Sequence, residues 1–437
     1  MIRKTIFPRI LLLCLLFCLV FVFIVLIQFS GRGAPRSSAA KKPFDLRDYT
    51  IAEAASAGDF NAAVSAWKDE NFFIWNRQIH EQNNEDLVIG FTEESIGRSA
   101  YSAALAAAPA AFLNGNRRTH ESAVFLGQLT QASRTLATAD RERLDDILVL
   151  MDLNSPDLLS EGRSTESGLI EFLTSRGHNN YIEGTVKIIK SLDSEYLELR
   201  HAAGVFKGYN DWKKYQSSEN PYSRLTEKAC AIVSESLIKI ESRNKVFIGE
   251  ENRIGTEYNL YLAKELLNWA ETERNEAWAG AARSIIHSVL SMGDSGFISD
   301  EFLAVGTGIT ESPASSKIST ARLYRILFPG EYSPKALPFA VSQTAVAWAW
   351  TSSPQVSAVT RNNVLDISVN FPAGESHFML IRGIRPFTRL QLQGLDWRAD
   401  SAFERYNSSG WSYLANEQTL MVKLRHRGTT EHIVIYF

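Results

Sequence analysis

Three pairs of adjacent acidic residues are the first candidates for chemistry in this chain of 437 residues. They are Glu93-Glu94, Glu250-Glu251 and Asp300-Glu301, and a nearby glycine or aromatic residue predicts that each pair lies between helices. Two carboxyl groups about 5–10 Å apart around a sugar can perform acid and base catalysis on a glycosidic bond. Adjacent acids in loops are more often solvated surface charge, so we favour that interpretation and keep the six residues as catalytic candidates only for an enzyme.

A second candidate site is the polar and aromatic stretch from Gly394 to Trp411, which we predict to be a long loop between strands. Function concentrates in such loops, where aromatic side chains can stack on a sugar or hold a partner protein. The alternative is that the aromatic residues close one end of a β-domain, with Arg398 and Arg405 paired to the nearby acids. We favour this alternative. The binding candidates are Trp397, Asp400, Glu404, Tyr406 and Trp411.

A third segment, Gly293-Asp294-Ser295-Gly296, resembles the nucleophile segment of chymotrypsin-like serine proteases. That family needs two β-barrels that position a histidine and an aspartate. Here the segment directly follows a helical stripe that ends at Val289, and Phe297 replaces the glycine that the family has next. We therefore predict a turn at the C-terminal end of a helix.

The sequence predicts no cofactor and no metal site. The motifs HExxH, GxxxxGK[ST] and GxSxG and any pair of CxxC motifs are absent from the chain. The eight histidines show no spacing typical of metal ligands.

The charge is distributed unevenly along the chain. Of 46 basic residues, seven lie in residues 1–42, which contain no acidic residue. With 49 acidic residues in the chain, the remainder has a formal charge of −10. A generally basic nucleic-acid binder is excluded, because phosphate neutralisation needs clustered lysine and arginine, and we predict no nucleic-acid partner. The aromatic content of 11% also excludes a disordered chain.

Residues 10–27 form an unbroken apolar run of 18 residues, which as a helix would span about 27 Å of a bilayer. A cleaved signal peptide is the alternative, but its apolar region is usually shorter and no good cleavage site follows here. We predict a cytoplasmic tail and transmembrane anchor at 1–29, and a flexible basic stalk at 30–48. The short N-terminal tail and the cysteine-poor body favour a single-pass protein of the bacterial inner membrane with a periplasmic body.

Helical periodicity dominates residues 49–334, which we predict to be an α-helical domain. Apolar stripes at 258–269 and 278–289, with a polar link between them, predict an αα-hairpin. A further stripe at 225–240 follows Asn220-Pro221, a pair typical of a helix start.

One short stretch of the helical region, Gly58 to Trp67, resembles the core of a tetratricopeptide repeat. The matching positions are Gly58, Asp59, Phe60, Ala63 and Trp67. The pattern does not recur at 34 residues, so the resemblance implies a packed helical hairpin rather than a peptide-binding array.

The periodicity changes to two where prolines become frequent, in the segment 313–386. Alternating or continuous apolar residues predict short strands in residues 335–437, which we interpret as an antiparallel β-sandwich. The predicted strands are centred on 346–350, 365–369, 378–381, 390–392, 420–424 and 433–437.

The predicted fold is therefore mainly α with β, with a transmembrane helix, a multi-helical domain and a C-terminal β-sandwich. The chain resembles uncharacterised membrane-anchored bacterial envelope proteins. The hairpin from Tyr258 to Val289, with Gly293-Asp294-Ser295-Gly296 after it, resembles one hairpin of the helical toroids that precede a β-sandwich in several glycoside-processing families. We predict a non-enzymatic binding or scaffolding protein whose partners are the bilayer and an envelope protein or glycan. The alternative is an anchored glycan-processing enzyme that uses the loop carboxylates.

Overall fold

The computed structural model describes residues 44–82, 84–108, 119–161, 167–328, 330–342 and 345–437. The chain divides into two compact units, Met1–Asp45 and Leu46–Phe437, and the elements below belong to the second. About half of the described residues are helical, and antiparallel sheets occupy the C-terminal part. The predicted span at residues 10–27 lies outside the described residues. Within those residues, no helix is both long and apolar enough to cross a bilayer.

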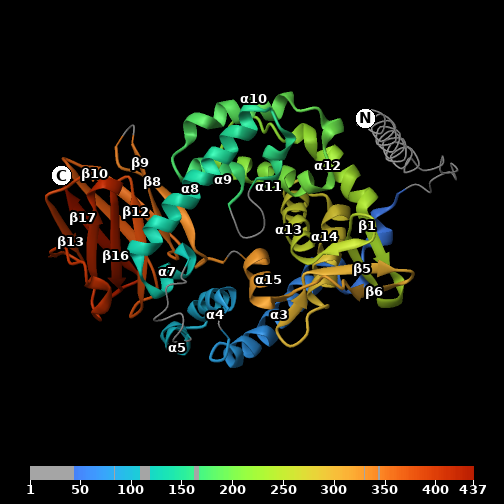
Figure 1. The fold of residues 1–437 in the computed structure, drawn as a ribbon, viewed down its shortest axis with the longest axis horizontal. Coiled ribbons are helices and arrows are strands. Elements are labelled where there is room, and N and C mark those ends of the chain that lie inside the picture. Colours follow the sequence, from blue (N-terminus) through green and yellow to red (C-terminus); the bar gives the residue numbers. More distant parts are fainter. Residues whose placement is uncertain (1–43, 83, 109–118, 162–166, 329, 343–344) are drawn as a thin grey trace, which may run out of the picture. The chain divides into compact units, whose positions relative to one another are not determined.

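Helices make up most of the second unit before residue 328 (Figure 1). The α-helices are α2 (Ala52–Ala55), α3 (Ala57–Gln78), α4 (Glu85–Gly97), α5 (Tyr101–Ala107), α7 (His120–Leu126), α8 (Leu129–Asp152), α9 (Leu169–Ser175), α10 (Ile182–Ser191), α11 (Leu199–Tyr215), α12 (Ser223–Ser236), α13 (Thr256–Thr272), α14 (Glu276–Leu290) and α15 (Thr320–Leu327). The 3₁₀ helices are η1 (Leu46–Tyr49), η2 (Pro156–Ser160), η3 (Asn179–Tyr181), η4 (Ser194–Tyr196), η5 (Glu241–Arg243), η6 (Phe403–Arg405) and η7 (Ala415–Glu417).

The predicted αα-hairpin is confirmed, because α13 and α14 lie side by side (Figure 1). Leu262 and Leu266 of α13 and Ile285 of α14 have no exposed surface, so the two stripes bury each other. The side chain of Asn275 accepts a hydrogen bond from the Trp278 N–H and so caps α14.

The tetratricopeptide-like stretch does not form the predicted hairpin. It lies within one helix, α3, and the helix before it, α2, has only four residues. Ser56 caps α3 by accepting the Asp59 N–H at 3.1 Å. Gly58 and Phe60 therefore belong to the first turns of α3, because the cap starts the helix before them.

Short strands interrupt the helical region, and the helical periodicity of the sequence did not predict these strands. The stripe at 225–240 is not one helix, because α12 ends at Ser236 and Leu237 starts a strand that pairs with Ile248. The side chain of Asn259 bonds both backbone groups of Ile248, so α13 satisfies the edge of this small sheet. The strands are β1 (Leu237–Ile240), β2 (Lys245–Ile248), β3 (Arg253–Gly255), β4 (Phe297–Ser299), β5 (Glu301–Val305), β6 (Gly308–Glu311) and β7 (Lys317–Ser319).

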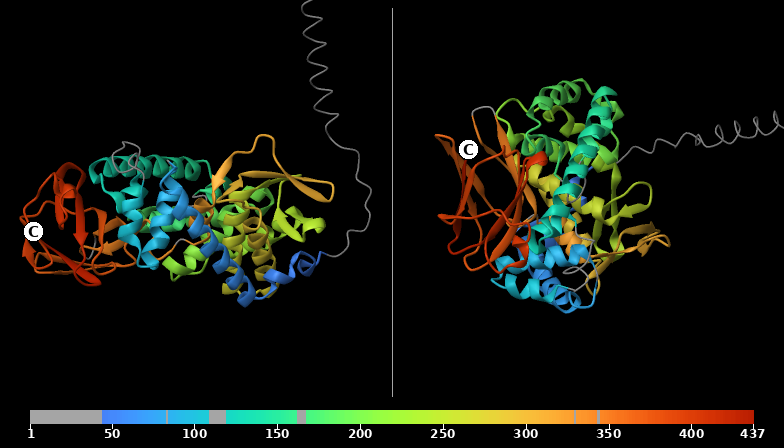
Figure 2. Two further views of the ribbon diagram at one scale, coloured as in Figure 1. Left: turned by 90° about the horizontal axis from the view of Figure 1, so that it is seen from below. Right: turned by 60° about the vertical axis from the view of Figure 1, so that its left-hand side comes forward.

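Two five-stranded antiparallel sheets form the C-terminal part (Figures 1 and 2). One has the order β10-β11-β17-β13-β14 and the other β15-β16-β12-β9-β8. All six predicted strand segments are present as strands. The strands are β8 (Lys335–Ala340), β9 (Val346–Thr351), β10 (Val356–Arg361), β11 (Val364–Asn370), β12 (Ser376–Arg382), β13 (Arg389–Leu392), β14 (Leu395–Asp396), β15 (Gly410–Leu414), β16 (Thr419–Arg425) and β17 (Thr430–Tyr436).

Alternate residues of β9 and β12 belong to two different buried clusters. Ala349 and Met379 join a cluster that also contains residues of β11 and β17 from the other sheet. Trp348, Trp350 and Phe378 point the other way, into a cluster shared with α7 and α8. Because both faces of this sheet are covered, the sequences of its central strands are continuously apolar and do not alternate between apolar and polar residues.

Arg176, just after α9, helps to join the helices to this sheet. Its guanidinium lies over the rings of Trp348 and Trp350, at 4.4 and 5.2 Å from their centroids, and pairs with Asp140 at 3.2 Å. The Trp350 indole N–H donates to the His120 carbonyl at 2.7 Å. The predicted domain boundaries, including the one at 334/335, stay predictions.

Candidate functional site

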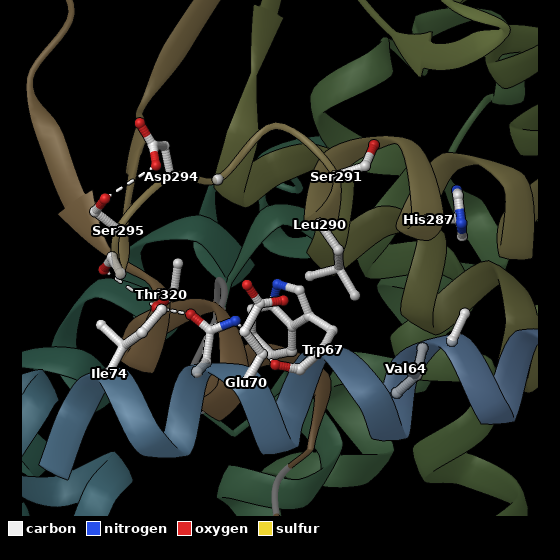
Figure 3. A pocket seen from close by; sticks show the side chains of 14 residues that line it. Val64, Trp67, Glu70, Ile74, His287, Leu290, Ser291, Asp294, Ser295 and Thr320 are labelled. Atoms are coloured by element: carbon white, nitrogen blue, oxygen red, sulfur yellow. Dashed lines mark hydrogen bonds between the residues drawn. The ribbon is translucent and has the colours of Figure 1, made fainter.

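A hollow of about 290 Å³ lies between α3, α14, the turn that follows α14 and the start of α15 (Figure 3). Trp67 and Glu70 enter it from α3, and Asp294 and Ser295 lie on the opposite side (Figure 3). His287 lines its other end on α14. We call this cavity the Trp67 hollow, and it combines an aromatic face with carboxylate and hydroxyl groups.

Buried hydrogen bonds hold the floor of the Trp67 hollow. Asn71, only 5% exposed, donates to the Trp67 carbonyl at 2.9 Å, and its Oδ1 lies 2.6 Å from the Thr320 hydroxyl. The indole N–H of Trp75 donates to the same hydroxyl at 3.0 Å. These bonds connect α3 to the start of α15. Buried polar groups whose hydrogen bonds are all made in this way hold the floor of the hollow in one geometry.

The Gly293–Gly296 segment forms a tight hairpin turn beside the hollow. Asp294 and Phe297 exchange both backbone hydrogen bonds, at 2.8 and 2.9 Å, and the two residues between them have positive φ. Two left-handed residues identify a type I′ turn, which glycine at 296 favours. The segment follows α14, as predicted. It is not the last turn of that helix, because α14 ends at Leu290, and it leads instead into β4.

The protease-like chemistry is not assembled around Ser295. Its hydroxyl donates to its neighbour Asp294 at 3.0 Å, while His287 lies at the far end of the hollow (Figure 3). A serine nucleophile needs a base within hydrogen-bonding reach. The described contacts give Ser295 no histidine partner.

The Trp67 hollow carries negative charge. Its acidic groups are Glu70 and Asp294, and no lysine or arginine is among its described lining residues. Within the described chain, no hydrogen bond or ion pair engages the Glu70 carboxylate. Burial lowers the pKa of His287, so its ring is uncharged near pH 7. A lysine lies close by, because the Lys245 ammonium donates to the carbonyl of the lining residue Ser291 at 3.1 Å.

The first predicted acid pair is buried inside a helix and does not lie between helices. Glu93 and Glu94 belong to α4, where a side chain on the nearby Gly90 would come within 3.1 Å of Ala321. Gly90 therefore allows close packing of α4 on α15 and does not mark a loop. The Ser333 hydroxyl donates to Glu93, and burial raises the pKa of Glu93 to about 7.

The other two acid pairs lie among the short strands. Glu250 and Glu251 are exposed in the turn between β2 and β3. Asp300 accepts hydrogen bonds from serine residues, which outweigh burial and lower its pKa, and Glu301 pairs with Arg253 at 2.8 Å. None of the six predicted acids lines the Trp67 hollow.

The aromatic candidates of the 394–411 stretch lie in different environments. Trp411 belongs to β15 and is only 8% exposed, and its indole N–H donates to the Trp397 carbonyl at 3.0 Å. Tyr406 is 53% exposed. Trp411 is therefore part of the buried cluster of the sheets, and Tyr406 keeps a surface that a partner can reach.

The acidic candidates of the same stretch bind backbone groups. Glu404 accepts the Leu129 N–H at 2.9 Å, and this caps α8 from a distant loop. An N-terminal cap typically stabilises by about 0.5–2 kcal/mol. Asp400 accepts the Ala402 N–H at 2.8 Å. The predicted pairs with Arg398 and Arg405 are not found among the described contacts, and a binding role for these residues stays a prediction.

Sequence reasoning missed a buried ionic cluster between α9, α11 and α13. The Lys207 ammonium lies 2.9 Å from Glu171 and 2.5 Å from Asp211, and Glu265 is only 3% exposed nearby. The spacing of Lys207 and Asp211, four residues apart on a helix, was the available signal.

The described residues contain no group of three or more histidine, cysteine or acidic side chains that could hold a metal ion. The functional candidate with a defined cavity is thus the Trp67 hollow, a partly open space built from residues about 230 positions apart. Comparisons with protein-family models, with curated proteins and with solved structures found no match to this chain.

Proposed function

We propose that this protein is a non-enzymatic binding protein of the bacterial cell envelope, and that it holds a glycan unit in the Trp67 hollow. The observation that carries the proposal is the indole of Trp67 beside Glu70, Ser291 and Ser295 in one cavity. Sugars bind through an apolar face that stacks on an aromatic ring and hydroxyls that hydrogen-bond to polar groups. At about 290 Å³ the cavity is at the small end of ligand pockets, so it suits a single sugar residue.

We further propose that residues 10–27 anchor the protein in the inner membrane and that the two C-terminal sheets pack as a β-sandwich. The apolar run supports the first part, and the buried cluster shared by Ala349 and Leu365, one from each sheet, supports the second.

The anchor is tested by alkaline carbonate extraction of bacterial membranes. We expect the full chain to stay in the pellet, and a variant lacking residues 1–29 to appear in the soluble fraction, because it lacks the apolar run. A full chain released by carbonate would contradict the anchor.

Substitution of Trp67 by alanine tests the glycan site. With the full chain in detergent, saturation-transfer NMR on glucose, galactose, N-acetylglucosamine and glucosamine measures binding. We expect Trp67→Ala to weaken it at least tenfold, since stacking on an indole is the main apolar contact. The matched control is Phe73→Ala, because Phe73 lies on the same helix, is 68% exposed and does not line the hollow. Binding of none of the four sugars, or equal binding by Trp67→Ala, would contradict the proposal.

A further inference from the structure

We infer, resting on the proposed function, that the Trp67 hollow prefers a sugar with a free, protonated amino group over a neutral sugar. The observation behind this inference is the sign of its charge. Glu70 and Asp294 line the hollow, and His287 is uncharged near pH 7. The ammonium of the nearby Lys245 binds the Ser291 carbonyl, and no described ion pair joins it to either carboxylate. A cation placed there meets carboxylates and gains from the contact, whereas an anion is repelled.

The two carboxylates are held on opposite sides of the cavity. Glu70 rises from α3, and Asp294 projects from the hairpin turn (Figure 3). The turn fixes Asp294, because its backbone is bonded to Phe297 in both directions and Ser295 donates to one carboxylate oxygen. The other oxygen of Asp294 has no donor among the described residues.

The indole adds a second reason to favour a cation. Trp67 is an aromatic ring of the lining, and the face of an indole attracts ammonium groups within about 6 Å of its centre. A protonated amino sugar can place its apolar face on the ring and its ammonium toward a carboxylate. A neutral hexose can stack and donate hydroxyl hydrogen bonds, but it brings no positive charge to the carboxylates, and an N-acetylated sugar has lost that charge.

Isothermal titration of the full chain in detergent at pH 7 tests this preference, with glucosamine, glucose and N-acetylglucosamine as probes. We expect glucosamine to bind about tenfold more tightly than either neutral sugar, as suits charged pairs in a partly open site. Asp294→Asn and Glu70→Gln should each reduce that ratio to about threefold or less. Raising the salt concentration to 0.5 M should also reduce it.

The matched control is Glu183→Gln. Glu183 of α10 pairs with Lys187 at 3.1 Å and does not line the Trp67 hollow, so the ratio should stay near tenfold. Equal affinities for glucosamine and glucose, both lost in Trp67→Ala, would overturn the charge preference and leave the proposed function standing. Failure of all three sugars to bind would overturn both. A ratio reduced as much by Glu183→Gln as by Asp294→Asn would overturn the assignment to this hollow.

Discussion

Replacing Lys207 with methionine is expected to lower the free energy of unfolding by about 3–5 kcal/mol. Methionine keeps the length and apolar stem of the side chain but removes its charge. Glu171 and Asp211 then lose the ammonium that lies 2.9 and 2.5 Å from them. Removing one partner of a buried ion pair leaves a charge without compensation, and this is the source of the cost.

The pKa shifts in the cluster show how strongly these groups depend on one another. Burial alone would lower the pKa of Lys207, but the surrounding carboxylates raise it well above its ordinary value. Burial raises the pKa of Asp211 despite Lys207, and its second oxygen has no hydrogen-bond partner among the described residues. Burial acts in the same direction on Glu171, but Lys207 outweighs it and lowers that pKa. The cluster therefore holds one firmly ionised pair and one carboxyl that protonates readily.

Denaturation with urea at pH 7.5 measures the effect of Lys207→Met. The matched control is Lys213→Met on the same helix, because that side chain is 53% exposed and its nearest acid, Glu273, is 3.7 Å away. We expect the control to change stability by less than about 0.5 kcal/mol. If Lys207→Met fails to fold, the double variant with Asp211→Asn should restore folding by removing one of the stranded charges. A loss below about 1 kcal/mol would show that the cluster is not energetically important.

The six predicted C-terminal strands could be recognised from the sequence because each of these six has its own apolar pattern. The missed strands lack such a pattern for physical reasons. β8 contains Pro338, which is tolerated because β8 is at the edge of its sheet and needs no donor there. β15 contains the predicted binding residue Trp411, whose neighbours Gly410 and Ser412 resemble loop residues. Burial against a sheet is a tertiary property, which local composition does not encode.

The Trp67 hollow was largely out of reach of the sequence for a related reason. Trp67 and Glu70 were one turn apart on a helix, but nothing local related them to Asp294 more than 220 residues later. The Gly293–Gly296 segment did attract notice, although for a resemblance that the geometry does not support. In the same way, the glycine beside Glu93 predicted a loop, while its actual role is close helix packing. Adjacent acids are visible in a sequence, whereas acids brought together by folding are not.

A buried histidine pair is expected to make the folded state sensitive to acid. His377 of β12 has no exposed surface, stacks on Phe371 with ring centroids 4.3 Å apart, and lies 5.1 Å from His426. Neither ring nitrogen of His377 has a hydrogen-bond partner among the described residues. A proton on His377 would place a charge in this cluster without a hydrogen-bond acceptor, and burial makes both rings favour the neutral form.

The direction of the pH effect follows from the shifts in pKa. Burial lowers the pKa of His426 to about 4, with Glu431 partly opposing it, and lowers that of His377 well below its ordinary value. In the unfolded chain a histidine takes up its proton near pH 6.5. The contribution of the two neutral histidines to the free energy of unfolding is therefore complete above about pH 6.5 and is lost as the pH falls toward 4. For His426 it amounts to about 3 kcal/mol.

Glu93 acts in the opposite direction over part of the same range. Its pKa is raised to about 7, so the folded state binds a proton that the unfolded state releases near pH 4.5. The stability that Glu93 contributes to the folded state is present at low pH and is lost as the pH rises through about 7. The net pH profile of the protein consequently hides the histidine effect, and only a comparison between variants isolates it.

Substitution of His426 by leucine is expected to remove most of this acid sensitivity. Leucine has a similar volume and no ionisable group, so at pH 7.5 the stability should stay within about 1 kcal/mol of the wild type. At pH 4.5 the variant should be more stable than the wild type by about 2–3 kcal/mol. In the wild type, unfolding lets His426 take up a proton, which favours the unfolded state, and leucine cannot take up a proton. Urea denaturation across this range measures the difference. Val359→Ala is the control, since Val359 of β10 is 53% exposed and carries no ionisable group, so it should give the same difference at both pH values. Parallel stability curves for the wild type and His426→Leu would mean that the histidine pair does not couple folding to protonation.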